Sequence, residues 1–277
     1  MRTTHLAIAA LLSVAGCSRD GDEGWRVYAA EYGHSEHFPR KALVHGESDG
    51  TQPLSWLVFV IRGHDRVILV DTGFDDPDLA RRKGVGDFRT APEALAELDV
   101  APEQVGDVVL THLHWDHAGN LSPWAQATFW LQADELEWAE GRVSVEQPRR
   151  GGLYLEDIRA VSGLVGAGRV QLVDGRAEVA PGIVLHRGGA HTTAIQWVEV
   201  RTGRTPGTIV LASDNAYLYE NLEEHVPIGA SRDARANLAE LDRMLELASR
   251  TDLVVPGHDP QILERHRRRG DRVVEIR

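Results

Sequence analysis

The chain has 277 residues, 42% of them hydrophobic and 26% charged, so it has enough apolar surface to fold and is not intrinsically disordered. Its 30 Lys and Arg residues against 42 Asp and Glu residues give a net charge of −12, which disfavours nucleic acid as a partner, because phosphate binding needs a clustered basic surface. The only basic run, Arg265 to Arg269, is typical of a solvated helix face.

The N-terminus has the features of an export signal. Arg2 supplies a positive start, residues 6–15 are apolar, and ten such residues are too few for a transmembrane helix, which needs roughly 20. The four residues Val-Ala-Gly-Cys that end at Cys17, the only cysteine, resemble the lipobox of bacterial lipoproteins. This implies a signal peptide over 1–16, lipidation of Cys17, a polar tether over 17–24, and export to a bacterial membrane with the domain facing the periplasm or exterior. An ordinary secretory signal or a buried free cysteine are the alternatives.

Strands and helices alternate along the remaining chain. The first half is predicted to contain a strand over 25–32, a hairpin of 54–61 with 66–70, a helix over 92–98 and a buried strand over 108–110. The second half is predicted to contain helices over 134–140, 155–164 and 233–248, and strands over 128–131, 170–173, 183–186, 194–200, 208–211 and 253–255. We therefore expect residues 25–277 to form one α/β domain with two β-sheets between helical layers.

The strongest motif is His112-Leu113-His114-Trp115-Asp116-His117, directly after the strand 108–110. Residues two apart in extended backbone point to the same side, so His112 and His114 can bind one metal ion. Asp116 and His117 come after the chain begins to turn, so they can face a second metal ion beside the first.

Further candidate ligands follow later strands, namely His191, Asp214 and His258. Imidazole and carboxylate ligands without thiolate suit two divalent metal ions, zinc or alternatively iron, manganese or cobalt. His186 lies within an apolar strand pattern and is interpreted as a core or surface histidine. Tryptophans other than Trp115 are interpreted as core residues. Histidines without metal spacing are interpreted as structural or exposed: His34, His37, His45, His64 and His225.

From Leu54 to His258 the chain resembles the metallo-β-lactamase superfamily. The resemblance implies an αββα sandwich with two mixed sheets and a dinuclear site at one edge. It implies that the turn Asp71-Thr72-Gly73 supports the metal loop, with Asp71 orienting ligands without binding metal. The implied ligands are His112, His114 and His191 for the first metal, Asp116, His117 and His258 for the second, and Asp214 as the bridge.

The stretch that begins at Asp214 resembles the N-acyl homoserine lactonases more closely. In that family a tyrosine three residues after the bridging aspartate leans over the metals, and Tyr217 occupies this position, although it is also interpretable as a packed aromatic. Trp115 falls where the family carries an aromatic residue of the acyl pocket. The loop around His191, Arg-Gly-Gly-Ala-His-Thr-Thr-Ala, departs from the superfamily pattern Thr-Pro-Gly-His-Thr-Pro-Gly.

The implied reaction opens a lactone ring, as in quorum quenching by hydrolysis of N-acyl homoserine lactones. A metal-bridging hydroxide would attack the carbonyl, Tyr217 would stabilise the oxyanion, and Asp116 or Asp214 would carry the proton to the leaving alkoxide. A thioesterase of the glyoxalase II type shares these ligands and remains an alternative, as does β-lactam hydrolysis. Class B1 β-lactamases, however, use a cysteine ligand, and class B3 enzymes lack the bridging aspartate. A lipoprotein that only binds metal or a small amphiphile is the non-enzymatic alternative.

Overall fold

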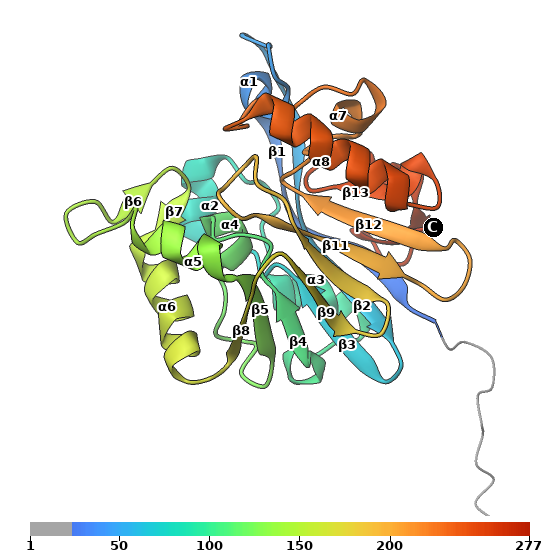
Figure 1. Cartoon of the computed structure of the whole chain (residues 1–277), viewed down its shortest axis with the longest axis horizontal. Coiled ribbons are helices and arrows are strands. Elements are labelled where there is room, and N and C mark those ends of the chain that lie inside the picture. The colour runs from blue at the N-terminus through green and yellow to red at the C-terminus, as the bar shows by residue number, and fades with distance from the viewer. Residues whose placement is uncertain (1–23) are drawn as a thin grey trace, which may run out of the picture.

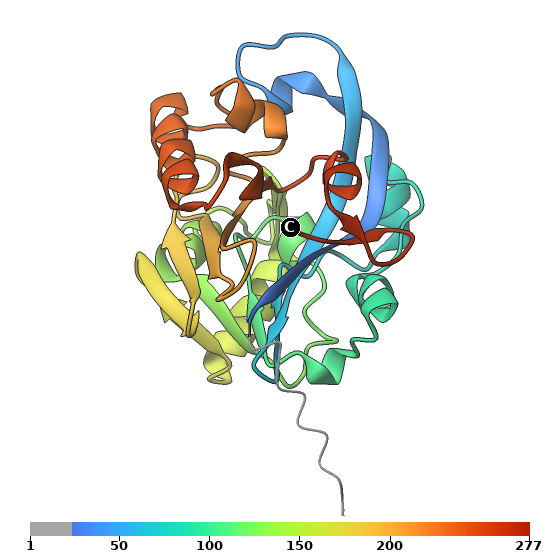
Figure 2. The ribbon, with the colours of Figure 1, turned by 90° about the vertical axis from the view of Figure 1, so that its right-hand side faces the viewer.

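The computed structural model describes residues 24–277, so the predicted signal peptide, Cys17 and most of the predicted tether lie outside the described residues. Two β-sheets face each other and helices cover their outer sides, which confirms the predicted αββα architecture. Figure 2 shows the layers edge on, with α8 on one outer side and α2 and α3 on the other. No helix of this described part is long and apolar enough to cross a membrane.

The first sheet has eight strands in the order β14-β15-β1-β2-β3-β4-β5-β8. Its β2–β3 hairpin is confirmed, and His64 and Asp65 at the turn have φ values of 50° and 56°, as a two-residue turn between twisted strands requires. The strands are β1 (Arg26–Pro39), β2 (Thr51–Gly63), β3 (Arg66–Val70), β4 (Asp107–Val109), β5 (Thr128–Gln132), β8 (Val170–Val173), β14 (Arg267–Arg268) and β15 (Val273–Glu275).

The second sheet has five strands in the order β13-β12-β11-β10-β9, and β12 and β13 are parallel. Their carboxyl ends therefore meet at one edge of the sheet. The strands are β9 (Arg176–Ala180), β10 (Ile183–Arg187), β11 (Gln196–Arg201), β12 (Thr208–Ser213) and β13 (Val254–Pro256), and a separate small hairpin joins β6 (Arg149–Arg150) to β7 (Leu153–Tyr154).

Nine helices longer than three residues connect these strands within residues 24–277. They are α1 (Arg40–Leu43), α2 (Pro77–Lys83), α3 (Ala91–Leu95), α4 (Trp115–Ala118), α5 (Ala133–Glu140), α6 (Leu155–Gly166), α7 (Tyr219–Glu223), α8 (Ala234–Leu247) and α9 (Ile262–Arg265). The predicted helices correspond to α3 with the short 3₁₀ turn that follows it, and to α5, α6 and α8.

Strand β1 shows how both faces of the first sheet are buried. Val27 and Ala29 pack in a hydrophobic cluster with residues of the second sheet, while the alternate residues Tyr28 and Ala30 pack in the cluster that includes α3, α5 and α6. Successive side chains of a strand point to opposite faces, so a sheet between two layers needs this unbroken apolar run. Burial of each large apolar side chain contributes about 1.5–3 kcal/mol.

Two sequence expectations need correction. The basic run near the C-terminus is not a helix face, because α9 ends at Arg265 and Arg267–Arg268 form the edge strand β14, which pairs with β15. Between them, His266 is buried and lies 3.0 Å from the Tyr219 hydroxyl. The first strand also continues past residue 32 to Pro39, because it pairs with the whole length of β2.

Candidate metal centre

The candidate ligands are delivered by the ends of strands from both sheets. His112 to His117 follow β4, Asp214 follows β12, and His258 follows β13. His191 lies in the loop between β10 and β11, which closes by a hydrogen bond from Gly188 N to Ile195 O. Buried strands are rigid, so loops at their ends hold these side chains in fixed positions.

The structure brings the seven candidates into two adjacent groups. In each group, the possible ligand atoms all lie within 4.8 Å of one another. The first group holds two short nitrogen–nitrogen contacts, because His114 Nδ1 lies 3.0 Å from both His112 Nε2 and His191 Nε2. The first group consists of His112, His114, His191 and Asp214. The second group, next to the first, consists of Asp116, His117 and His258.

Asp214 faces both groups with one carboxylate. Its Oδ2 lies 3.3 Å from His191 Nε2 and 3.7 Å from His112 Nε2. Its Oδ1 lies 3.1 Å from His258 Nε2 and 3.2 Å from His117 Nε2. The carboxylate therefore has the geometry expected of a bridge between two cations.

His117 carries a buried nitrogen without a hydrogen bond. Its Nδ1 is 2.8 Å from Asp71 Oδ2, which fixes the ring, while Nε2 makes no hydrogen bond and points toward Asp116 and Asp214. Asp71 also accepts hydrogen bonds from the backbone and hydroxyl of Thr111. An unpaired buried nitrogen facing two carboxylates fits a bound cation, because a buried polar atom without a partner is otherwise costly.

The protonation preferences of the site also fit two cations. Burial, assisted by the neighbouring His191, lowers the pKa of His114 to about 3, and burial lowers the pKa of His112 and His191 as well. These imidazoles are thus neutral, the form that binds metal. Burial opposes protonation of His117, but Asp214, Asp116 and Asp71 together raise its pKa well above the ordinary value. The carboxylates thus favour positive charge here, which divalent ions would supply.

Backbone strain accompanies the ligand loops. Asp71 and Ser213, the residue before Asp214, have φ values of 62° and 49°, uncommon for residues with a side chain. Gly257 precedes His258, and a Cβ at that position would lie 2.9 Å from the carbonyl carbon of Ser213. The β12 and β13 ends therefore approach too closely for any residue larger than glycine at this position.

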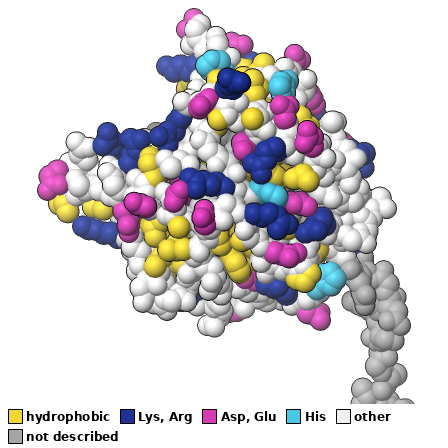
Figure 3. All heavy atoms as spheres, viewed as in Figure 1, with side chains coloured by type: hydrophobic (Ala, Val, Ile, Leu, Met, Phe, Trp, Pro, Cys, Tyr) yellow, Lys and Arg dark blue, Asp and Glu magenta, His cyan; other side chains and the backbone are white. Residues whose placement is uncertain are grey.

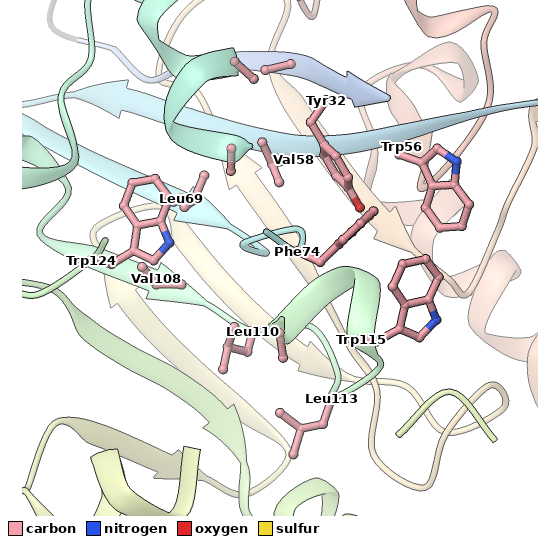
Figure 4. Packing of buried hydrophobic residues seen from close by; sticks show 14 of the residues in the cluster. Tyr32, Trp56, Val58, Leu69, Phe74, Val108, Leu110, Leu113, Trp115 and Trp124 are labelled. Carbon is pink, nitrogen blue, oxygen red and sulfur yellow. The ribbon is translucent and has the colours of Figure 1, made fainter. Parts of the chain in front are cut away.

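A cavity of about 220 Å³ opens over the two groups, and both Trp115 and Tyr217 line it. The Tyr217 hydroxyl lies 3.5 Å from His191 Nδ1, so it lies at the cluster. Figure 4 shows Trp115 on α4 beside Trp56, and their ring centroids are 5.4 Å apart. Trp56, interpreted from the sequence as a core residue, is buried but also lines the cavity with Phe38.

Glu135 is a residue of the site that the sequence analysis missed. This fully buried carboxylate of α5 accepts hydrogen bonds from Leu113 N at 3.4 Å, Thr192 Oγ1 at 2.7 Å and Ala194 N at 3.0 Å. It thereby joins the loop of His112 and His114 to the loop of His191. A glutamate on the buried face of a helix is the only sequence signal that could have revealed it.

The remaining histidines of the described chain lie outside both groups. His186 is buried with its ring stacked on Trp197 at 4.0 Å, and its Nε2 lies 2.8 Å from Glu199. Of the two interpretations from the sequence, a core or a surface histidine, the structure therefore supports the core one.

Comparison with known proteins supports the family resemblance found in the sequence. The model of the metallo-beta-lactamase superfamily matches residues 52–258. An N-acyl homoserine lactonase of Bacillus cereus is 26% identical over 166 residues, which cover 60% of this chain and 60% of that protein. The N-acyl homoserine lactonase AiiB of Rhizobium rhizogenes is 31% identical over 134 residues, 47% of each chain. The chain thus matches 60% of the length of the first relative and 47% of the second.

Solved structures extend the likeness over most of the fold. The crystal structure of a quorum-quenching N-acyl homoserine lactone lactonase has a TM-score of 0.69 at 21% identity, covering 87% of this chain and 95% of the other. AidC, a dizinc quorum-quenching lactonase, has a TM-score of 0.63 at 13% identity, covering 87% and 92%. At these identities the structures show a shared fold.

Proposed function

Because this chain belongs to the metallo-beta-lactamase superfamily, we propose that it is a dinuclear metal-dependent hydrolase that opens the ring of a lactone, with N-acyl homoserine lactones as the substrates. One observation carries the proposal: a single carboxylate, Asp214, faces two ligand groups beneath a cavity that also contains a tyrosine hydroxyl. Pure metal storage needs neither the cavity nor the hydroxyl, so the arrangement favours catalysis over the non-enzymatic alternative.

The first ion would be held by His112, His114 and His191, the second by Asp116, His117 and His258, and Asp214 would contact both. Two bound divalent ions supply Lewis acidity toward a carbonyl oxygen and lower the pKa of water. The native metal is proposed to be zinc, since imidazole and carboxylate ligands suit it.

The protein side chains provide the remaining chemistry. Burial, reinforced by Asp214 and Asp116, raises the pKa of Tyr217 well above its usual value, so the hydroxyl keeps its proton and can donate it in a hydrogen bond to a developing oxyanion. Asp116, half-buried at the cavity, is placed to carry a proton to the leaving alkoxide oxygen. Trp115, Trp56 and Phe38 provide an apolar wall for an acyl chain.

Relatives named as N-acyl homoserine lactonases support the substrate class, and the proposed role is quorum quenching. With the proposed export and the lipid anchor at Cys17, the domain would meet lactones outside the cytoplasm, before they reach an intracellular receptor.

Hydrolysis of matched substrates tests this proposal. The purified full chain, with its metal content measured by mass spectrometry, would be assayed on N-hexanoyl homoserine lactone, a hexanoyl thioester and a β-lactam. We expect two metal ions per chain and lactone opening, a loss of at least about 100-fold in Asp214→Ala with reduced metal content, and a loss of about tenfold in Tyr217→Phe with unchanged metal content.

Asp242→Ala is the matched control, because it removes an exposed carboxylate that pairs with His225 and belongs neither to the ligand groups nor to the cavity lining. Its activity should equal that of the wild type. Turnover of the thioester or the β-lactam without lactone opening would retain the metal centre and reject the lactonase assignment.

A further inference from the structure

Lys83, the last residue of α2, places a cation at the mouth of the metal-centre cavity. Its side chain lines the cavity together with Trp115, and its Nζ lies 4.9 Å from the centroid of the Trp115 ring. The lysine is exposed, whereas Trp115 is buried and immediately precedes the candidate ligand Asp116. A substrate entering along Trp115 would therefore pass the ammonium group.

Among the described residues, this ammonium group has no acidic partner. Its neighbours in the same helix turn differ, because Arg81 pairs with Asp78 and Arg82 pairs with Asp76. Within residues 24–277, no Asp or Glu side chain forms an ion pair with Lys83. The cavity's own carboxylates, Asp116 and Asp214, belong to the candidate metal groups and face the histidines.

A second cation, Arg149, lies on the aromatic contacts that continue outward from Trp115, although unlike Lys83 it pairs with an acidic residue, Glu156, at 3.4 Å. The Tyr154 ring is stacked on Trp115 with centroids 6.2 Å apart, and the Arg149 guanidinium lies 4.5 Å from the centroid of Tyr154. Figure 3 shows Lys and Arg side chains gathered on the face over α2 and the β6–β7 hairpin. This local gathering of Lys and Arg side chains does not follow from the overall composition, because the chain has a net charge of −12.

We infer that Lys83 forms an anion subsite, and that the preferred substrates carry a negatively charged group, such as a carboxylate, at the end of the acyl portion remote from the bond that is cleaved. The inference rests on the proposed function only in taking the acyl group to lie along Trp115. An ammonium at the entrance would pair with the anionic end while the aromatic wall contacts the methylene groups. An anionic substituent would then gain a charge-assisted contact that a methyl-terminated chain lacks.

Selectivity between paired substrates tests the subsite. N-acyl homoserine lactones of four to ten acyl carbons would be compared with analogues of equal length that end in a carboxylate. We expect the wild type to favour the carboxylate analogue in kcat/KM at one or more lengths. In Lys83→Met, which keeps a long apolar stem over Trp115, the carboxylate analogue should lose about tenfold more than the neutral substrate, a difference equivalent to about 1.4 kcal/mol.

Charge and position provide two controls. Lys83→Arg should retain the preference, and the preference should decrease as salt is added. Arg81→Met removes a cation from the exposed side of the same helix turn and should leave the selectivity ratio at the wild-type value. Equal losses for both substrates in Lys83→Met would overturn the inference, because Lys83 would then act only by supporting Trp115. Equal kcat/KM values for the two tails in the wild type would overturn it as well.

A parallel measurement separates this inference from the lactonase proposal. Thioesters with the same two kinds of acyl tail would be assayed for turnover. Hexanoyl amides with and without the terminal carboxylate would be tested for binding by saturation-transfer NMR. If no lactone is opened but the carboxylate tail is still preferred in thioester turnover or in binding, and Lys83→Met removes that preference, the lactonase proposal fails and the anion subsite stands. If lactones are opened without tail selectivity, the lactonase proposal stands and the anion subsite fails.

Discussion

Glu135 shows how a single buried residue controls two loops that are distant in the sequence. Its hydrogen bonds connect Leu113, 22 residues earlier, with Thr192 and Ala194, 57 and 59 residues later. Burial raises its pKa to about 7, although these hydrogen bonds lower it. The carboxyl is therefore more easily ionised in the unfolded chain, where its pKa is about 4.3, than in the folded protein.

This shift predicts a pH-dependent stability. Between about pH 4.5 and pH 7 the unfolded state loses the Glu135 proton before the folded state does, so the contribution of this group falls as pH rises. Urea unfolding of wild type and Glu135→Gln, at equal metal loading, should show the variant gaining about 3 kcal/mol relative to wild type from pH 5 to pH 8. Glu137→Gln, an exposed change in the same helix, should show no such gain. Parallel pH profiles for wild type and Glu135→Gln would contradict this account.

The candidate ligands named from the sequence come together in the structure because they follow short apolar strands, and strand ends meet at the edges of sheets. It did not indicate Glu135 or the cavity role of Trp56, because both depend on contacts between residues far apart in the chain. Trp56 has the pattern of an ordinary core residue in β2, and only the approach of α4 places it beside Trp115.

Strands and helices whose apolar residues repeat with a clear period of two or 3.6 residues were predicted from the sequence, whereas short polar elements were missed. Helix α2 has only seven residues and two buried positions, so its apolar pattern is too short to recognise, although Asp76 and Gly84 cap it. The hairpin of β6 and β7 has two residues per strand and no pattern at all. Yet this hairpin contacts the metal centre.

Gly152, between β6 and β7, lies close to the candidate metal ligand His114 and limits the position of its side chain. A Cβ at this residue would lie 2.7 Å from His114 Cδ2, and Gly152 O accepts a hydrogen bond from Trp115 N. We expect Gly152→Ala to displace His114 and to weaken metal binding about tenfold in a chelator competition, with a proportionate loss of hydrolysis. The adjacent Gly151→Ala is the control, because Gly151 also has a positive φ, of 57°, but a Cβ added there would have no atom within 4 Å. If both variants lose metal equally, backbone strain and not contact with His114 is responsible.

At the scale of the whole molecule, the sequence predicted two sheets between helical layers but not the order of the strands. The C-terminal strand β15 pairs with β1, and β14 extends the same edge, so the first sheet is completed only by the last residues of the chain. Pairings over such separations have no local sequence signal, since each short strand is compatible with several neighbours.

The described residues 24–277 contain both metal groups and the cavity, so the proposed membrane attachment can be tested separately from the chemistry. Trp25 is held at the start of β1 by hydrogen bonds from its backbone to Thr202 O and from its indole to Pro181 O. The predicted anchor, Cys17, lies before this point in the chain. A change at Cys17 should therefore alter location without altering the active domain.

Cys17→Ala tests this separation. We expect wild type expressed in a bacterium to incorporate labelled palmitate and to enter the detergent phase of a Triton X-114 extraction, because several acyl chains give stable membrane attachment where one is marginal. The variant should lose the label and move to the aqueous phase, with its melting temperature and lactone kcat/KM within about twofold of wild type. A wild type that is unlabelled and aqueous would favour an ordinary secretory signal. If the released variant also interferes with lactone signalling as well as the wild type does, the anchor determines where the protein resides and is not needed for its effect on neighbours.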